Sequence, residues 1–389
     1  MIPYLLVFGA SAIVAFATTP LVRRLAVKLG AVDHPSDRKV HPSATPTAGG
    51  LALLLGVLAG FGASAFIPSF DVLHKLSDEP RAVVAVAVVI VAIGAFDDIK
   101  GLPVVGKLAG QIAAAGLLVL LGVQLLYLWF PGAGIISLSS DLAVPLTILW
   151  IVVMTNAINF IDGLDGLAAG MVAIAAVAFF LFVYRDPVVG AGTSAAALIC
   201  AITAGACIGF LPWNFNPAKI FMGDTGAMLL GLLLAVATMS AVGRSPFPPS
   251  AGELAAFSIP LLVPLLVLAI PFLDLVLAVI RRFRRGRALT HADKQHIHHQ
   301  LLDLGHSHRE AVLLMYLWSA LISGAALAVA FIDGRLLIGA ILLAEGVVFA
   351  VTVVPRVLQY FAMTRRHRSL LGERPRGEED RERNARQPA

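Results

Sequence analysis

The sequence predicts an all-α, polytopic integral membrane protein with about eleven transmembrane helices, and three observations carry this prediction. Of the 389 residues, 58% are hydrophobic and only 14% are charged, a composition that water-soluble domains of this length do not normally have. The apolar residues gather in runs of about 20, the length that a helix needs to cross the hydrocarbon. Lys and Arg gather in alternate connecting segments.

The predicted spans follow one another with no separate soluble domain. The run from Ala82 to Phe96 is short for a span, which a bilayer tolerates as modest mismatch. The first run has Arg23 and Arg24 after it and no basic residue before it, so we predict a permanent span rather than a secretory signal. The spans begin near Ile2, Gly50, Ala82, Leu108, Leu142, Leu167, Gly192, Ala227, Ala255, Ala311 and Leu336.

The distribution of basic residues predicts the orientation. With the N-terminus outside, the inner segments hold 24 Lys and Arg and the outer loops hold five, which is the asymmetry of the positive-inside rule. The C-terminus is then cytoplasmic. The net charge of +5 reports topology, and we expect no nucleic-acid partner.

Residues 1–360 are predicted to form a single transmembrane domain. Residues 361–389 are dense in Arg and Glu, and we expect a disordered cytoplasmic tail. Cys200 and Cys207 lie in one apolar span, too far apart along a helix for a disulfide, and are read as packing residues.

Carboxylates at the predicted inner ends of spans are the first candidate site residues. Charge beside hydrocarbon is expensive and commonly functional. Asp97 and Asp98 end the third span; one is expected to hold a cation, and the other to accept a proton or steer an acceptor phosphate. Asp224, in FMGDTG, opens the eighth span, where it suits either a helix N-cap or a Mg²⁺ ligand.

The stretch NAINFIDGLDG adds four polar side chains. Asp162 and Asp165 converge whether the segment is helical, where they share one face, or looped, where the glycines permit a tight turn. Asn156 and Asn159 have the same spacing just before them. They are candidates for amide contacts to a base or sugar, or for hydrogen bonds between helices.

Two basic segments complete the candidate set. The first inner loop carries Arg38, Lys39 and His41 ahead of Gly49-Gly50, and glycine lets backbone approach a phosphate closely. After the ninth span, which contains Asp274, come a run of arginines and three histidines, His296, His298 and His299. These imidazoles suit hydrogen bonds to phosphate or proton transfer near neutral pH, and the surrounding oxygen ligands favour a harder ion than zinc.

In combination, the motifs resemble those of the polyprenyl-phosphate N-acetylhexosamine-1-phosphate transferases (glycosyltransferase family 4). They are DHPSDRKVH with the later GG, FDD, NFIDGLDGLA, FMGDTG, and PFLD followed by HADKQHIHH. The resemblance runs in order over most of the chain, from Asp33 to about Met315. HADKQHIHHQLL is similar to the branch that uses UDP-N-acetylglucosamine (UDP-GlcNAc) rather than UDP-N-acetylmuramoyl-pentapeptide.

The resemblance implies an activity. A GlcNAc-1-phosphate group would pass from UDP-GlcNAc to polyprenyl (undecaprenyl or decaprenyl) phosphate at the inner face of the bacterial plasma membrane, releasing UMP, as the first membrane step of cell-envelope polysaccharide synthesis. It also suggests a homodimer. The alternatives are the muramoyl-pentapeptide transferase and, more distantly, an ion-coupled transporter, whose site would lie near the midplane.

Residue roles carry over by position. Asp97, Asp98, Asp224 and the three histidines match the catalytic set, with Asp224 and Asp98 as the metal residues for Mg²⁺, or Mn²⁺ as the alternative. Asn159, Asp162 and Asp165 match the nucleotide-sugar region, and we add Arg38, Lys39, His41, Asn156 and Asp274 as substrate-binding candidates. We expect direct attack by the lipid phosphate aided by Asp97, with a covalent aspartyl-phosphate route through Asp98 as the alternative.

Overall fold

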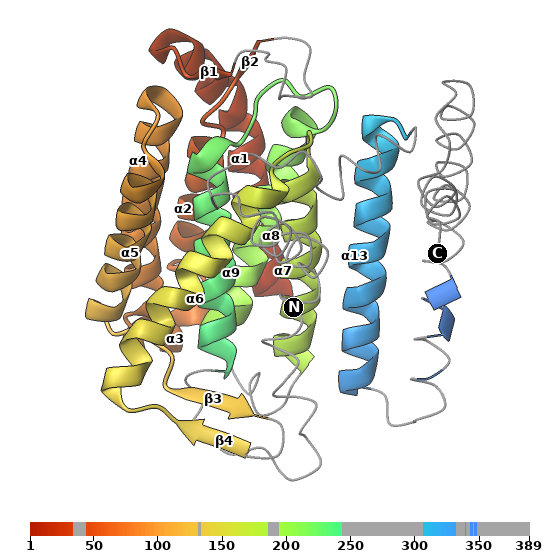
Figure 1. Cartoon of the computed structure of the whole chain (residues 1–389). Coiled ribbons are helices and arrows are strands. Elements are labelled where there is room, and N and C mark those ends of the chain that lie inside the picture. The colour runs from red at the N-terminus through yellow and green to blue at the C-terminus, as the bar shows by residue number, and fades with distance from the viewer. Residues whose placement is uncertain are drawn as a thin grey trace, which may run out of the picture.

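A computed structural model describes residues 1–33, 44–130, 134–185, 194–242 and 306–331, with a few positions between 339 and 347. These residues form a bundle of apolar helices with two short β-hairpins, β1–β2 at one end and β3–β4 at the other (Figure 1). In chain order the elements are α1 (Ile2–Leu29), β1 (Val32–Asp33), β2 (Thr45–Pro46), α2 (Gly50–Ser64), the 3₁₀ turn η1 (Pro68–Phe70), α3 (Asp71–Leu76), α4 (Glu79–Lys100), α5 (Val104–Leu120), β3 (Tyr127–Phe130), β4 (Gly134–Ser137), α6 (Ser140–Ile161), α7 (Leu167–Arg185), α8 (Ala195–Asn214), α9 (Gly223–Val242) and α13 (His308–Phe331).

Nine of the eleven predicted spans coincide with one of these helices. Seven of the described helices are long and apolar enough to cross a bilayer, and α2 with the segment Pro68–Leu76, bent by 89°, makes an eighth if the pair counts as one span. α5 is apolar but shorter, with 17 residues. The span predicted from Ala255 lies outside the described residues, and only a few positions of the span predicted from Leu336 are described. The chain is therefore a mostly helical, multi-pass membrane protein.

Two details differ from the sequence-based expectation. The third span is not short, because α4 begins at Glu79, with Pro80 in its first turn, and runs for 22 residues to Lys100. Proline is tolerated in a first turn, where its missing N–H has no helical partner to lose. The two antiparallel hairpins depart from a purely helical fold; both lie in connections between helices, where backbone groups without helical partners still need hydrogen bonds.

α9 is the central helix of the described bundle. It contacts α2, α4, α6, α7 and α8, and nearly all of its residues are buried, as expected of a helix that is apolar on every side. Its first turn lies directly against the start of α2. A Cβ added at Gly50 would fall 2.2 Å from the backbone nitrogen of Gly226, so only glycine permits this approach.

The backbone N–H groups of Gly49 and Gly50 thus have hydrogen-bond acceptors within the protein. Their N–H groups donate to the carbonyl oxygens of Phe221 and Met222, both at 2.9 Å. We predicted that these glycines would let backbone approach a phosphate, whereas the structure places them against the segment that leads into α9. Their effect is to fix where α9 begins.

Helix ends converge at the end of the bundle that carries β1–β2. α4, α6 and α8 finish there, α5, α7, α9 and α13 begin there, and residues of each border one cavity or adjoin its lining. Alternating helix directions therefore bring segments far apart in sequence, the acidic motifs among them, to one end of the bundle.

Candidate active site

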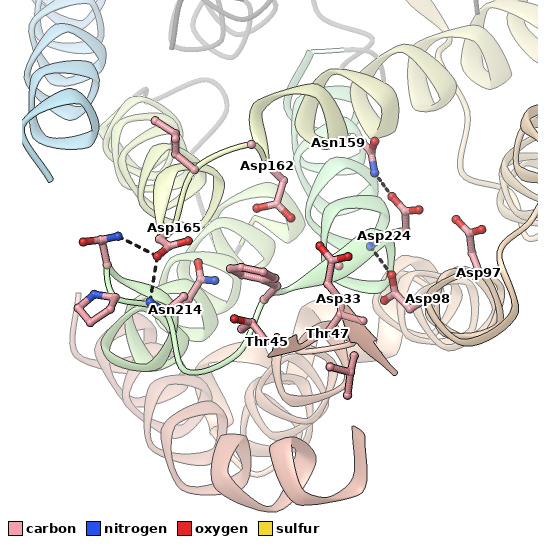
Figure 2. A pocket seen from close by; sticks show the side chains of 18 of the residues that line it. Asp33, Thr45, Thr47, Asp97, Asp98, Asn159, Asp162, Asp165, Asn214 and Asp224 are labelled. Atoms are coloured by element: carbon pink, nitrogen blue, oxygen red, sulfur yellow. Dashed lines mark hydrogen bonds between the residues drawn. The ribbon is translucent and has the colours of Figure 1, made fainter. Parts of the chain in front are cut away.

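The cavity at this end has a volume of about 1330 Å³, ample for a nucleotide sugar. Figure 2 shows the carboxylates of α4, α9 and the α6–α7 loop facing it from several sides. Six predicted site residues line it: Asp97, Asp98, Asn159, Asp162, Asp165 and Asp224.

Lys107, near the start of α5, joins two of these carboxylates. Its Nζ lies 2.5 Å from Oδ2 of Asp97 and 2.5 Å from Oδ2 of Asp224. The Asp97 side chain is 2% exposed, whereas that of Lys107 is 33% exposed, so the ammonium remains open to the cavity. Lys107 is not among the predicted site residues, because its sequence position has the pattern of an inner topology charge.

Asp224 lies in the first turn of α9 with its side chain toward the cavity. Besides Lys107, it accepts a hydrogen bond from the amide of Asn159 at the end of α6. Asn159 therefore orients the carboxylate and leaves fewer of its lone pairs free. The predicted N-cap role is not what Asp224 does, since its own backbone N–H is the group that receives a cap.

That cap is Asp98, one helix away in the last turn of α4. Its Oδ1 accepts from the N–H of Asp224 at 2.9 Å (Figure 2). Its Oδ2 accepts from the N–H and the hydroxyl of Thr225 at 3.2 and 2.5 Å. Asp97, its neighbour, turns instead toward Lys107 and accepts from the N–H of Leu102 at 2.5 Å. The two adjacent carboxylates thus have different surroundings.

The segment with Asp162 and Asp165 is a loop, because α6 ends at Ile161 and α7 begins at Leu167. Gly166, with φ of 82°, makes a turn that favours glycine. Asp165 accepts from the side-chain amide of Asn216 and the N–H of Ala218, both at 2.9 Å. Asp165 therefore ties this loop to the segment between α8 and α9.

Asp162 faces the cavity between Asp165 and the Asp98–Asp224 pair (Figure 2). Burial, and then the negative charges of Asp224, Asp98 and Asp165, raise the pKa of its carboxyl well above the ordinary value. A shift with these causes marks a place where negative charge is in excess and where a cation would bind favourably.

The other predicted residues fall into two groups. Asn156 does not line the cavity: its amide donates to the buried Gln111 of α5 at 2.7 Å and to the carbonyl of Val152, which is the helix-joining alternative. The remaining candidates lie outside the described residues: Arg38, Lys39, His41, Asp274, His296, His298 and His299.

The charge of the described lining bears on metal binding. Six aspartates line the cavity against two lysines and one arginine. No group of three or more His, Cys, Asp or Glu within the described part of the chain is arranged to hold a metal ion by itself. Mg²⁺ commonly binds through one or two carboxylates plus substrate phosphates and water, and this acidic lining fits that mode rather than an all-protein cage.

Comparison with known proteins agrees with the motifs. The model of glycosyl transferase family 4 matches residues 81–242. Over 362 residues the chain is 42% identical to the decaprenyl-phosphate N-acetylglucosaminephosphotransferase of Mycobacterium tuberculosis (strain ATCC 25618 / H37Rv), covering 90% of this chain and 89% of that protein. It is 36% identical to the probable undecaprenyl-phosphate N-acetylglucosaminyl 1-phosphate transferase of Bacillus subtilis (strain 168), over 82% of each.

Similarity to the other branch is weaker. The phospho-N-acetylmuramoyl-pentapeptide-transferase of Mycolicibacterium smegmatis is 34% identical over 60% of this chain and 75% of its own length. The shared motifs, the matched family model and the near full-length similarity lead to one conclusion: the chain belongs to glycosyl transferase family 4, among relatives named as N-acetylglucosamine phosphotransferases.

Proposed function

We propose that this enzyme transfers GlcNAc-1-phosphate from UDP-GlcNAc to a polyprenyl phosphate, giving polyprenyl-diphosphate-GlcNAc and UMP. The observation that carries the proposal is the acidic cavity at the helix ends, in which Lys107 bridges carboxylates from two helices. A soluble diphosphate and a lipid phosphate can react only where an aqueous pocket meets the membrane. The names of the relatives, which pair polyprenyl phosphates with N-acetylglucosamine phosphotransfer, support the same substrates.

Lys107 is the group we assign to the substrate diphosphate. In the described structure its charge is balanced by Asp97 and Asp224, and a diphosphate entering the cavity offers it stronger partners. When Lys107 turns to the diphosphate, Asp97 loses its counter-charge and is free to accept a proton from, or to orient, the acceptor phosphate. An oxygen of that phosphate then forms a bond to the sugar-linked phosphorus as the bond to UMP breaks.

We assign a divalent cation, Mg²⁺ or Mn²⁺, to Asp224, whose carboxylate faces an acidic cavity and is oriented by Asn159. When bound, the cation supplies neutralisation of the diphosphate and stabilises the leaving UMP. Asp98, the second predicted metal residue, is a weaker candidate, because both of its oxygens accept hydrogen bonds from α9. The same occupation argues against the covalent route through Asp98.

The remaining roles concern the nucleotide sugar. We assign Asn159, Asp162 and Asp165 to the walls of its pocket, with Asp165 shaping the loop through Asn216 and Ala218. Arg38, Lys39, His41, Asp274 and the three histidines His296, His298 and His299 are proposed as further phosphate or sugar contacts, on sequence grounds alone. Asn156, which does not line the cavity, is proposed to affect substrate binding only indirectly, through its hydrogen bond to Gln111.

For the whole chain, we propose eleven spans with the N-terminus outside, the C-terminus cytoplasmic and the cavity open to the cytoplasm at the plasma membrane. Residues 1–360 would form one catalytic domain and residues 361–389 a disordered tail. The excess of basic residues in inner segments supports this orientation. A homodimer is proposed on family grounds.

A donor-choice assay tests the function. Purified protein is supplied with Mg²⁺ and polyprenyl phosphate, and UMP release is measured with UDP-GlcNAc and with UDP-N-acetylmuramoyl-pentapeptide in parallel. We expect release with UDP-GlcNAc alone; release with the pentapeptide donor instead would assign the chain to the other branch, and release with neither would leave the transporter as the alternative. Incubation with donor alone, without lipid, tests the mechanism: a phosphorylated enzyme would contradict direct attack.

A further inference from the structure

Asp98, one of the central carboxylates of the site, has both of its oxygens occupied by hydrogen bonds from another helix, two from backbone N–H groups and one from a side-chain hydroxyl. Both oxygens accept from the first turn of α9, three hydrogen bonds in all. The first N–H groups of any helix lack intrahelical partners and need an acceptor. Here the acceptor is Asp98 of another helix. The two residues from whose N–H groups it accepts lie 126 and 127 positions further along the chain.

The packing around this contact admits little else. Gly223 has φ of 69°, and a Cβ added there would fall 2.2 Å from Oδ2 of Asp98 and 2.5 Å from the hydroxyl of Thr47. One turn before Asp98 on the same face of α4, a Cβ at Gly94 would fall 2.6 Å from Cα of Thr225. Glycines therefore bring α4 and the start of α9 close enough for the Asp98 carboxylate to reach the two N–H groups.

The contact determines where Asp224 points. Its N–H is held by Asp98 while its side chain extends the other way, to Asn159 and Lys107. Thr225, which gives Asp98 its other two bonds, is fully buried. The backbone that bears the Asp224 carboxylate is thus held from α4, and a negative charge at a helix N-terminus also interacts favourably with the helix dipole.

We infer that Asp98 is a positioning residue, which holds the first turn of α9 so that Asp224 faces the reacting phosphates, and that it is neither a metal ligand nor a nucleophile. The inference rests on the proposed function, in which Asp224 holds the divalent cation. The two aspartates at the end of α4 then have different roles. Asp97 interacts with Lys107 and the substrate, whereas Asp98 holds the first turn of α9.

Substitutions separate the two kinds of role. In Asp98→Asn the side-chain oxygen still accepts from the N–H of Asp224, and the amide can donate to the Thr225 hydroxyl, so only the Thr225 N–H loses its acceptor. Asp98→Ala removes all three bonds. We expect kcat with Asp98→Asn to be about tenfold below wild type and with Asp98→Ala to be at least about tenfold lower again, as buried N–H groups lose their partners. If Asp98 were a nucleophile or a charged metal ligand, Asp98→Asn and Asp98→Ala would lower kcat by the same factor.

Thermal unfolding without Mg²⁺ or substrate gives a readout that is independent of activity. Loss of a cap lowers the Tm, whereas loss of a carboxylate from a crowded acidic cavity relieves repulsion and holds or raises it. We expect Asp98→Ala to melt below wild type and Asp162→Ala, the matched control, to melt at or above it. Thr225→Val, of similar shape, should lower activity in the same direction as Asp98→Asn, with Thr225→Ser retaining the wild-type rate.

The outcomes are distinguishable from failure of the proposed function. If the wild-type protein releases no UMP from UDP-GlcNAc, the function is wrong and the melting comparison still tests the cap. If the wild type is active but Asp98→Asn is as inactive as Asp98→Ala, or if Asp98→Ala melts at or above wild type, the positioning role is overturned. Should Asp98→Ala fail to fold, the Thr225→Val and Thr225→Ser pair decides: equal activity of the two would overturn it.

Discussion

At the scale of single residues, the site is organised by how each charge is compensated. Asp97 and Asp224 share Lys107, Asp98 accepts backbone N–H groups, and Asp165 holds a neighbouring segment. Burial, followed by the negative charges of neighbouring carboxylates, raises the pKa of Asp162. Compensation by a partly exposed lysine differs from compensation by backbone, because the lysine side chain can turn from its carboxylate partners to a substrate.

Removal of the bridging ammonium should therefore impair catalysis severely. We expect Lys107→Gln to lower kcat/KM for UDP-GlcNAc by about 100-fold or more, since a positioned charge on a transferring phosphoryl group contributes on this order. Steady-state UMP release measures the effect. Lys75→Gln, at a lysine whose side chain is 75% exposed on α3, is the control and should leave the rate unchanged. An unaltered kcat/KM in Lys107→Gln would remove Lys107 from the mechanism.

The raised pKa of Asp162 predicts a pH-dependent stability. Because folding raises this pKa, the stability that the protonated carboxyl contributes is fully present below the unfolded value, about pH 4, and is lost as the pH rises through the folded value. Asp162→Asn stays neutral at every pH. Without divalent cations, its Tm advantage over wild type should be larger at pH 8 than at pH 5, and added Mg²⁺ should diminish it.

Asp78→Asn is the matched control for this pH effect, because the Asp78 side chain is 82% exposed at the start of α4. Its Tm should follow that of wild type at both pH values. An Asp162→Asn variant whose Tm difference from wild type did not change with pH would show that neither burial nor the neighbouring carboxylates raise the pKa of Asp162.

Residue identity alone predicted part of this arrangement. Carboxylates and amides beside apolar spans are costly and commonly functional. This predicts six of the cavity-lining residues: Asp97, Asp98, Asn159, Asp162, Asp165 and Asp224. Lys107 was missed, because one lysine near the start of an inner helix has the same pattern as a topology charge. The cap that Asp98 forms on α9 joins residues 126 positions apart, and no local spacing encodes such a pair.

At the scale of helices, the site depends on how closely α4 approaches the first turn of α9. The hydropathy of the sequence predicts both helices. It does not predict how closely they approach, because that distance depends on a position without a side chain. Gly94 has no Cβ to hold the helices apart, and the nearest atoms to such a Cβ belong to the backbone of Thr225 and Asp224. Backbone yields less easily than a flexible side chain, so the contact is sensitive to a single methyl group.

Gly94→Ala should separate the two helices. We expect a loss of about 1–3 kcal/mol in unfolding free energy from overpacking, together with a fall in UMP release as Asp98 and Asp224 move apart. Gly62→Ala in α2 is the control, since its Cβ would meet nothing within 4 Å and alanine is the better helix former. It should be neutral or slightly stabilising. Gly94→Ala with wild-type Tm and activity would contradict the close packing.

At the scale of the whole molecule, the substrate pocket lies at one end of a membrane bundle, and which side of the membrane that end faces decides whether UDP-GlcNAc can reach it. α1 ends beside β1, which lines the cavity, whereas α4 begins at the opposite end and finishes at the cavity. Lys28 and Asp78 therefore mark opposite ends of the bundle. Both are exposed, which makes them suitable positions for a surface label.

Cysteine labelling tests this orientation with little interference, because the two native cysteines, Cys200 and Cys207, are buried. With the cavity facing the cytoplasm, a membrane-impermeant maleimide should label Asp78→Cys in intact cells and should label Lys28→Cys only after the cells are permeabilised. The unmodified protein should stay unlabelled in both conditions. The reverse pattern would place the pocket outside the cell, where no cytoplasmic nucleotide sugar could enter it, and the proposed reaction would have no donor.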